Sequence, residues 1–145
     1  MPLEMMEHVA LRTDNLIPTR DFYVNVVGLR EGPRPKFDFG GHWLYLGETA
    51  VIHLIHFNHD SDGSKFDGIM GRRDKYSDDG SGAVDHLAFR CNDFAGTKKR
   101  MDEMKVPLKT NYIADFNISQ LFVEDPNGVT VEMNFHGDSG AKSAA

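Results

Sequence analysis

Two halves of the chain carry matching residues whose side chains can bind a transition metal. The stretch "HVALRTDNL" from His8 aligns without gaps with "HLAFRCNDF" from His86, and an acidic residue precedes each histidine. Glu132 follows His86 by 46 residues, and His53 follows His8 by 45 residues, so His53 is the counterpart of Glu132 in the repeat. Three imidazoles and one carboxylate form a mixed nitrogen and oxygen donor set that suits a divalent transition metal.

Two further histidines, His56 and His59, lie close to His53 in the segment "TAVIHLIHFNH". The apolar and β-branched residues of this segment predict a strand, on which His53 and His56 point to opposite faces. The spacing therefore does not favour one ion bound by three neighbouring histidines. Each histidine alone is also compatible with a surface residue or a hydrogen-bonded core residue.

Glu132 is unusual because it lies inside the apolar strand "VTVEMNF", between Val131 and Met133. A carboxylate in such a place is costly unless it is paired or coordinates a cation. In both copies the candidate ligands lie on the strand face opposite the apolar residues. A sheet that curves around the axis relating the copies would bring all four ligands together. Taken singly, each residue could equally be a hydrogen-bonded residue of a sheet.

A helix is predicted after the first strand of each copy. "DNLIPTRDFYVNVVGL" has Asp14 or Asn15 as a cap and Gly28 as its end, and "NDFAGTKKRMDEMKVPL" begins at Asn92 or Asp93. The apolar residues of the second helix, which we expect to pack in the core, are Phe94, Met101 and Met104.

Strands are expected after each helix. The clearest are "HWLYLG" and "TAVIHLIHF" in the first copy, and "SQLFVED" and "GVTVEMNF", joined by the turn "DPNG", in the second. Weaker strands are expected near residues 29–38 and 108–116. The predicted fold class is therefore α+β, with two tandem βαβββ modules forming a curved mixed sheet around a metal site and helices on the outside.

One domain is expected to span residues 1–145. Module one covers about 5–57 and module two about 83–136. The Gly, Asp and Ser-rich segment 58–82 is predicted to be a linker or a functional lid, and the small polar tail 137–145 is predicted to be disordered.

The composition narrows the class of protein. The chain has 145 residues, of which 40% are hydrophobic and 26% charged, and this suits a globular domain with a real core. A formal charge of −6 argues against nucleic acid or an anionic membrane as partner. No signal peptide or membrane span is evident, so a cytoplasmic protein is expected. Cys91, the single cysteine, excludes an internal disulfide and is expected to be a small apolar residue rather than a nucleophile.

The chain resembles the vicinal oxygen chelate superfamily, which includes glyoxalase I, methylmalonyl-CoA epimerase, extradiol dioxygenases and bleomycin resistance proteins. The resemblance covers residues 6–136 and rests on "HVALRTDNLIPTRDFYVNVVGL", "AVIHLI", "DHLAFRC" and "QLFVEDPNGVTVEMNF". It implies that His8, His86 and Glu132 bind a metal, with His53 as the fourth ligand of the glyoxalase and epimerase branches. The metal could be Zn, Fe, Mn, Ni or Co.

The resemblance implies a metal-dependent lyase, isomerase or epimerase, with Glu132 in the catalytic centre and a small substrate chelated through adjacent oxygens. A ring-cleaving dioxygenase with Fe(II) is the alternative enzyme. That branch has an acid/base tyrosine ten residues before its glutamate ligand, where this chain has Phe122. A metal-free, ligand-sequestering binding protein is the alternative from another class. The resemblance also implies a homodimer.

Several residues are candidates for binding substrate. Arg12 and Arg90 share the strand face of the ligands and could hold an anionic group in bidentate fashion. Trp43 and Tyr45 could form an aromatic wall, although packing in the core would explain them equally well. The residues that could also approach the site are His42, Gln120 and Asn134. The sequence assigns no general base.

Overall fold

The structure is a computed structural model that describes residues 4–56, 80 and 84–143. The chain divides into two compact units, Met1–Asp79 and Gly80–Ala145. Their described residues, 4–56 and 80 with 84–143, are called module one and module two below. Apart from Gly80, the predicted linker or lid at 58–82 lies outside the described residues.

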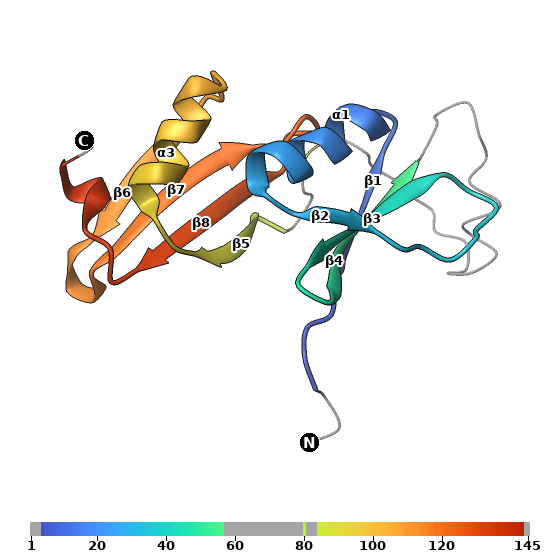
Figure 1. Cartoon of the computed structure of the whole chain (residues 1–145), viewed down its shortest axis with the longest axis horizontal. Coiled ribbons are helices and arrows are strands. Elements are labelled where there is room, and N and C mark those ends of the chain that lie inside the picture. Colours follow the sequence, from blue (N-terminus) through green and yellow to red (C-terminus); the bar gives the residue numbers. More distant parts are fainter. Residues whose placement is uncertain (1–3, 57–79, 81–83, 144–145) are drawn as a thin grey trace. The chain divides into compact units, whose positions relative to one another are not determined.

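Module one is a β-α-β-β-β unit whose four-stranded sheet has the order β1-β4-β3-β2 (Figure 1). β1 runs parallel to β4, and the other neighbouring pairs are antiparallel. The predicted helix is α-helical in its first part and π-helical in its second, and it ends at Gly28, whose φ of 103° suits glycine. The bounds are β1 Val9–Thr13, α1 Leu16–Asp21, π-helix η1 Phe22–Val27, β2 Arg30–Gly32, β3 Gly41–Leu46 and β4 Thr49–His56.

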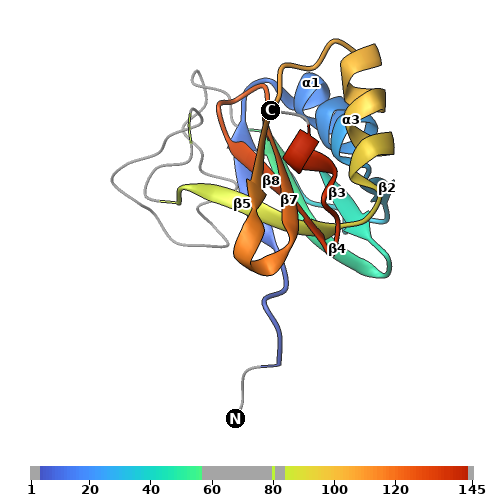
Figure 2. The ribbon, with the colours of Figure 1, turned by 90° about the vertical axis from the view of Figure 1, so that its left-hand side faces the viewer.

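Module two repeats this plan, with the strand order β5-β8-β7-β6 and a parallel β5-β8 pair. Helix α3 lies on one face of this sheet, where it contacts β7 (Figure 2). The tandem βαβββ architecture predicted from the sequence is therefore confirmed, as two open four-stranded sheets rather than a closed barrel. The bounds are β5 His86–Cys91, α3 Phe94–Glu103, β6 Lys109–Ile113, 3-10 helix η2 Ala114–Phe116, β7 Ile118–Glu124, β8 Thr130–His136 and 3-10 helix η3 Gly140–Ser143.

Each module has an apolar core between its helix and one face of its sheet. The alternation of buried and less buried residues along β8 leaves the other face of module two available for polar residues. Met104 was predicted to be in the core, but this is wrong, because it lies just past the last turn of α3 and is 42% exposed. The most completely buried apolar side chains are Tyr23, Leu44, Ile52 and Leu54 in module one and Phe94, Met101, Leu121, Val131 and Phe135 in module two.

The tail that the sequence analysis expects to be disordered is ordered through Ser143, where η3 ends. Ala141 is buried, and its backbone N–H donates to Ser119 Oγ at 2.9 Å. Ser119 Oγ in turn donates to the Asp138 carbonyl at 2.7 Å. A buried hydroxyl needs such partners, so the small polar residues of the tail complete the hydrogen bonding of β7.

Cys91 has a free thiol whose pKa is raised by burial. A thiol with a raised pKa holds little thiolate at neutral pH and is a poor nucleophile. None of the helices among the described residues is long and apolar enough to cross a membrane.

Asp93 is the cap of α3, and its loss should destabilise the protein measurably. Its side chain accepts a hydrogen bond from the Gly96 backbone N–H at 3.0 Å, and its φ is 62°. We expect Asp93→Ala to lower the free energy of unfolding by about 1–2 kcal/mol, because it removes the cap and because alanine tolerates the left-handed region less well than aspartate or asparagine. Asp93→Asn should retain most of the stability. Urea unfolding of both variants checks this, and equal losses would contradict the capping role.

Candidate metal centre

Module two brings His86 and Glu132 together on one face of its sheet. His86 Nε2 lies 3.8 Å from Glu132 Oε2, and the side chain of Glu132 is only 14% exposed. Two ligands that bind one ion at about 2.1 Å with a tetrahedral angle lie about 3.4 Å apart. The distance between His86 Nε2 and Glu132 Oε2 therefore needs to shorten by only a few tenths of an ångström for both atoms to bind one ion.

The Glu132 carboxylate is held by two amide side chains. Gln120 Nε2 donates to Glu132 Oε1 at 3.3 Å, and Asn134 Nδ2 donates to Glu132 Oε2 at 2.9 Å. Gln120 and Asn134 were predicted only to approach the site, and the structure places both in contact with the candidate ligand. Their strand register follows from the β7-β8 pairing, which sets Gln120 opposite Asn134 and Phe122 opposite Glu132.

Module one brings His8 and His53 together in a different geometry. Their rings are stacked, with centroids 3.7 Å apart and planes within 11° of parallel. The ring of Trp43 stacks on His53 at 3.9 Å. The lone pairs of imidazole nitrogens lie in the ring planes, so two parallel rings cannot both point at an ion about 2.0–2.1 Å away. To share an ion, one of the two rings must turn out of the stack.

An acidic neighbour binds the Nδ1 atom of the first histidine in each module. His8 Nδ1 lies 2.9 Å from Glu7 Oε1, and His86 Nδ1 lies 2.8 Å from Asp85 Oδ2. A carboxylate on Nδ1 fixes the proton there and leaves the Nε2 lone pair for a metal, which is the usual support of a metal-binding histidine. The repeat thus extends from the candidate ligands to the carboxylates that bind them.

His53 of module one and His86 of module two have pKa shifts in opposite directions. The hydrogen bond to Asp85 raises the pKa of His86, with a further contribution from the charge of Glu132. Burial lowers the pKa of His53, and the neighbouring His8 lowers it further. Metal binding requires the neutral imidazole, so a proton competes with an ion more strongly at His86 than at His53.

Removal of the Asp85 carboxylate should lower the pKa of His86. A raised pKa means that the Asp85 contact stabilises the fold at low pH and that this contribution is lost as the pH rises through the pKa of His86. We therefore expect the imidazole of His86 to titrate at lower pH in Asp85→Asn, as measured by NMR. Asp115→Asn, which changes an exposed carboxylate of η2, is the control, and an unshifted His86 in Asp85→Asn would contradict the assignment.

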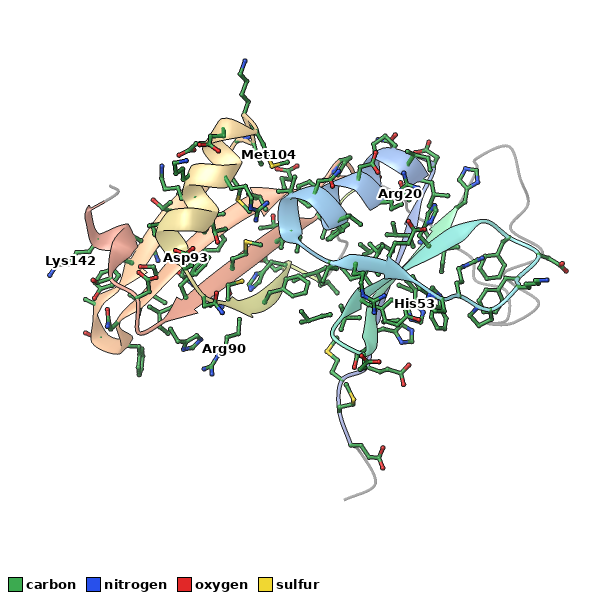
Figure 3. The ribbon with its side chains drawn as sticks, in the orientation of Figure 1. Arg20, His53, Arg90, Asp93, Met104 and Lys142 are labelled. Carbon is green, nitrogen blue, oxygen red and sulfur yellow. The ribbon has the colours of Figure 1, made fainter. Side chains whose placement is uncertain are left out.

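The candidate substrate residues differ in their surroundings. Figure 3 shows Arg90 projecting from β5, where it pairs in register with Asn134. Arg12 is half-buried and lies two residues beyond Ala10, which pairs with His53. The Tyr45 hydroxyl donates to the Pro33 carbonyl at 2.5 Å.

Trp43 lies beside an aromatic group that the sequence analysis missed. Phe37 and Phe39, in the loop between β2 and β3, stack at 4.9 Å with the Arg34 guanidinium over both rings, and Phe37 lies 6.5 Å from Trp43. Their pattern "PKFDF" carries no periodic signal that would have identified them.

His42 lies away from the candidate ligands. Along β3 it alternates with Trp43, which stacks on His53, so it points to the opposite face of the sheet. There it binds the carboxylate of Glu31, which also lies 3.9 Å from Arg20 of α1. The suggestion that His42 approaches the site is therefore wrong.

The donor chemistry fits a divalent transition metal, although each pair is found within its own module. Among the described residues, no group of three or more His, Cys, Asp or Glu side chains is arranged to hold an ion. His86 and Glu132 are nearly at chelating distance, and both His8 and His86 have their Nδ1 atom bound by a neighbouring carboxylate. These features are compatible with metal ligands.

Comparison with known proteins defines the family. The sequence model of the Glyoxalase/Bleomycin resistance protein/Dioxygenase superfamily matches residues 6–133, so the chain belongs to this superfamily. This confirms the resemblance found in the sequence. No curated protein sequence matches the chain significantly.

Solved structures share the fold at low sequence identity. A lactoylglutathione lyase from Agrobacterium tumefaciens is 19% identical, with a TM-score of 0.63 and 100% of each chain covered. A putative glyoxalase family protein from Bacillus anthracis is 17% identical, with a TM-score of 0.65 and coverage of 92% of this chain and 96% of the other. An antibiotic binding protein from Streptomyces sp. CB03234 is 16% identical, with a TM-score of 0.64 and coverage of 94% and 98%. The fold is therefore shared by an enzyme and by a binding protein.

Proposed function

We propose that the protein is a divalent-metal-dependent enzyme of the glyoxalase-like kind, acting as a lyase, isomerase or epimerase. His8, His53, His86 and Glu132 are the proposed ligands of the ion. The observation that carries the proposal is the pairing of His86 with Glu132 at 3.8 Å. In module one, one ring of the His8–His53 stack would turn out of the stack for both to bind. The pKa shifts of His53 and His86 are compatible with ligands that compete with protons.

A bound ion would act as a Lewis acid toward a substrate with two adjacent oxygens, stabilising the negative charge that develops on them. The protein's own residues would bind and orient that substrate. Arg90, exposed on the face that carries Glu132, offers a guanidinium to an anionic group of the substrate, and Arg12 is its repeat counterpart. Trp43 offers an aromatic surface next to His53.

The proposal is tested by asking whether the protein exchanges a substrate proton with solvent, and whether this exchange requires the metal. Protein loaded with Zn, Fe, Mn, Ni or Co is incubated in heavy water with small α-hydroxy ketones, and deuterium at the carbon next to the carbonyl is measured by NMR. We expect exchange with loaded protein and none above background with metal-free protein or Glu132→Ala. Consumption of oxygen with a catechol on the Fe(II) protein, without deuterium exchange, would instead favour the dioxygenase.

A ligand-sequestering protein is the second candidate, and the stacked rings of module one favour it. His8, His53 and Trp43 form a continuous aromatic stack that could receive a planar ligand without metal. Trp43 is the only tryptophan of the chain, so its fluorescence reports binding there. Saturable quenching by a planar aromatic ligand in the presence of a chelator would favour this candidate over the enzyme.

A homodimer is also proposed, since members of the superfamily are often dimeric. Sedimentation equilibrium gives the mass directly, against a chain mass of 16.3 kDa.

A further inference from the structure

We infer that Gln120 and Asn134 are positioning residues that set the direction in which the Glu132 carboxylate meets a metal, with Asn111 fixing the Gln120 amide. This inference rests on the proposed metal-dependent function and deepens it. It concerns a row of side chains that crosses the sheet of module two. In register, Asn111 of β6 pairs with Gln120 of β7, and Gln120 pairs with Asn134 of β8.

The hydrogen bonds along this row all run toward Glu132. Asn111 Nδ2 donates to Gln120 Oε1 at 2.8 Å, so the Nε2 group of Gln120 must face the other way. Gln120 Nε2 then donates both to Asn134 Oδ1 at 3.0 Å and to Glu132 Oε1 at 3.3 Å. Because Asn134 Oδ1 accepts from Gln120, the Nδ2 group of Asn134 is the one that faces Glu132.

The result is one amide donor on each carboxylate oxygen. Gln120 donates to Oε1, and Asn134 donates to Oε2, which is the oxygen that lies 3.8 Å from His86 Nε2. A carboxylate oxygen has two lone-pair sites, so each oxygen keeps one for an ion. Held at both ends, the carboxylate cannot rotate without breaking a hydrogen bond.

Burial makes these contacts effective. Gln120 is 9% exposed and the Glu132 side chain is 14% exposed, so water competes poorly for the carboxylate. Hydrogen bonds to a ligand from its neighbours orient it and typically change metal affinity by about 10–100-fold when they are removed. Asn111, Gln120 and Asn134 have no common spacing in the sequence, and only the register of β6, β7 and β8 brings them into one row.

The experiment measures affinity for Co²⁺ and Zn²⁺ alone, by competition with a chromophoric chelator. Gln120→Met and Asn134→Leu keep approximate size and remove the donors, and Thr130→Val is the matched control. Thr130 lies on the same strand and face as Asn134, two residues from Glu132 on its other side. We expect about 10–100-fold weaker binding in the first two variants, a smaller loss in Asn111→Ala, and wild-type affinity in the control.

Two further readouts separate positioning from a structural role. The visible spectrum of bound Co²⁺ should change in Gln120→Met and Asn134→Leu, because the carboxylate approaches the ion differently. The thermal unfolding midpoint of the metal-free variants should stay close to that of wild type. Should either variant fold poorly, Gln120→Asn, which withdraws the amide by one methylene, is expected to give the same loss of affinity and the same spectral change.

The possible outcomes distinguish this inference from the function on which it rests. Wild-type affinity and spectrum in Gln120→Met and Asn134→Leu, with metal binding lost in Glu132→Ala, would overturn the inference and leave the metal centre intact. An equal loss in Thr130→Val would also overturn it, because the effect would then be structural. No metal binding by the wild type would overturn both the centre and the role of the amides.

Discussion

Glu132→Ala is expected to weaken binding of a divalent transition metal by at least about 100-fold, because it removes the single charged ligand and leaves imidazoles alone. The side chain is largely buried, lies 3.8 Å from His86 Nε2 and accepts hydrogen bonds from both Gln120 and Asn134. Competition with a chromophoric chelator measures the loss. Glu132→Gln keeps the shape without the charge and should lose nearly as much.

Glu124→Ala is the matched control for this prediction. Glu124 is another carboxylate of the same hairpin, it is exposed at the end of β7, and it pairs with Thr130 rather than with a candidate ligand. Its removal should leave the affinity unchanged. Equal affinities for wild type and Glu132→Ala would show that the ion, if any, binds elsewhere.

Leu121→Ala is expected to lower the free energy of unfolding by about 3 kcal/mol, within the range of 2–5 kcal/mol found for buried leucines. Leu121 is 0% exposed, and it occupies the face of β7 opposite Gln120. The burial of this face fixes the register of β7 against β8, because a slip by one residue would turn every side chain to the wrong side. The same apolar contacts therefore hold Gln120 beside Glu132.

Urea unfolding followed by circular dichroism measures this loss. Phe116→Ala is the control, since Phe116 is a larger apolar side chain that is 75% exposed and should contribute less than about 0.5 kcal/mol. A similar loss in both variants would contradict the assignment of Leu121 to the core that holds the register.

Much of the fold could be predicted because the chain repeats its own pattern. The alignment of His8 with His86 placed two equivalent strands, and the helix signals after them gave the same order of elements twice. Alternation along the strands also predicts that the candidate ligands lie on the face opposite the apolar residues, and in the structure Ala10 lies opposite His53 just as Ala88 lies opposite Glu132. Local periodicity in the sequence is enough to predict the order of the elements and the face of a strand on which a residue lies.

Features that depend on contacts between distant residues could not be predicted. Gln120 becomes a partner of Glu132 only through cross-strand pairing, and its hydrogen bond to Asn134 Oδ1 turns the Asn134 amide group toward Glu132. The helix η3 was missed because its stability comes from the buried Ser119 hydroxyl and not from its own small residues. The stacking of His8 on His53 was missed because the orientation of these rings depends on packing with Trp43, which stacks on His53 and is distant from it in the sequence.

The metal content of the protein, purified without a histidine tag and measured by mass spectrometry, tests the central claim most directly. Wild type, Glu132→Ala and His53→Ala are compared after reconstitution and removal of free ions. We predict close to one ion per chain in wild type and very little in Glu132→Ala, while retention in His53→Ala would indicate a site of three ligands. Wild-type protein that holds no ion even after reconstitution would contradict the metal centre and favour the binding protein.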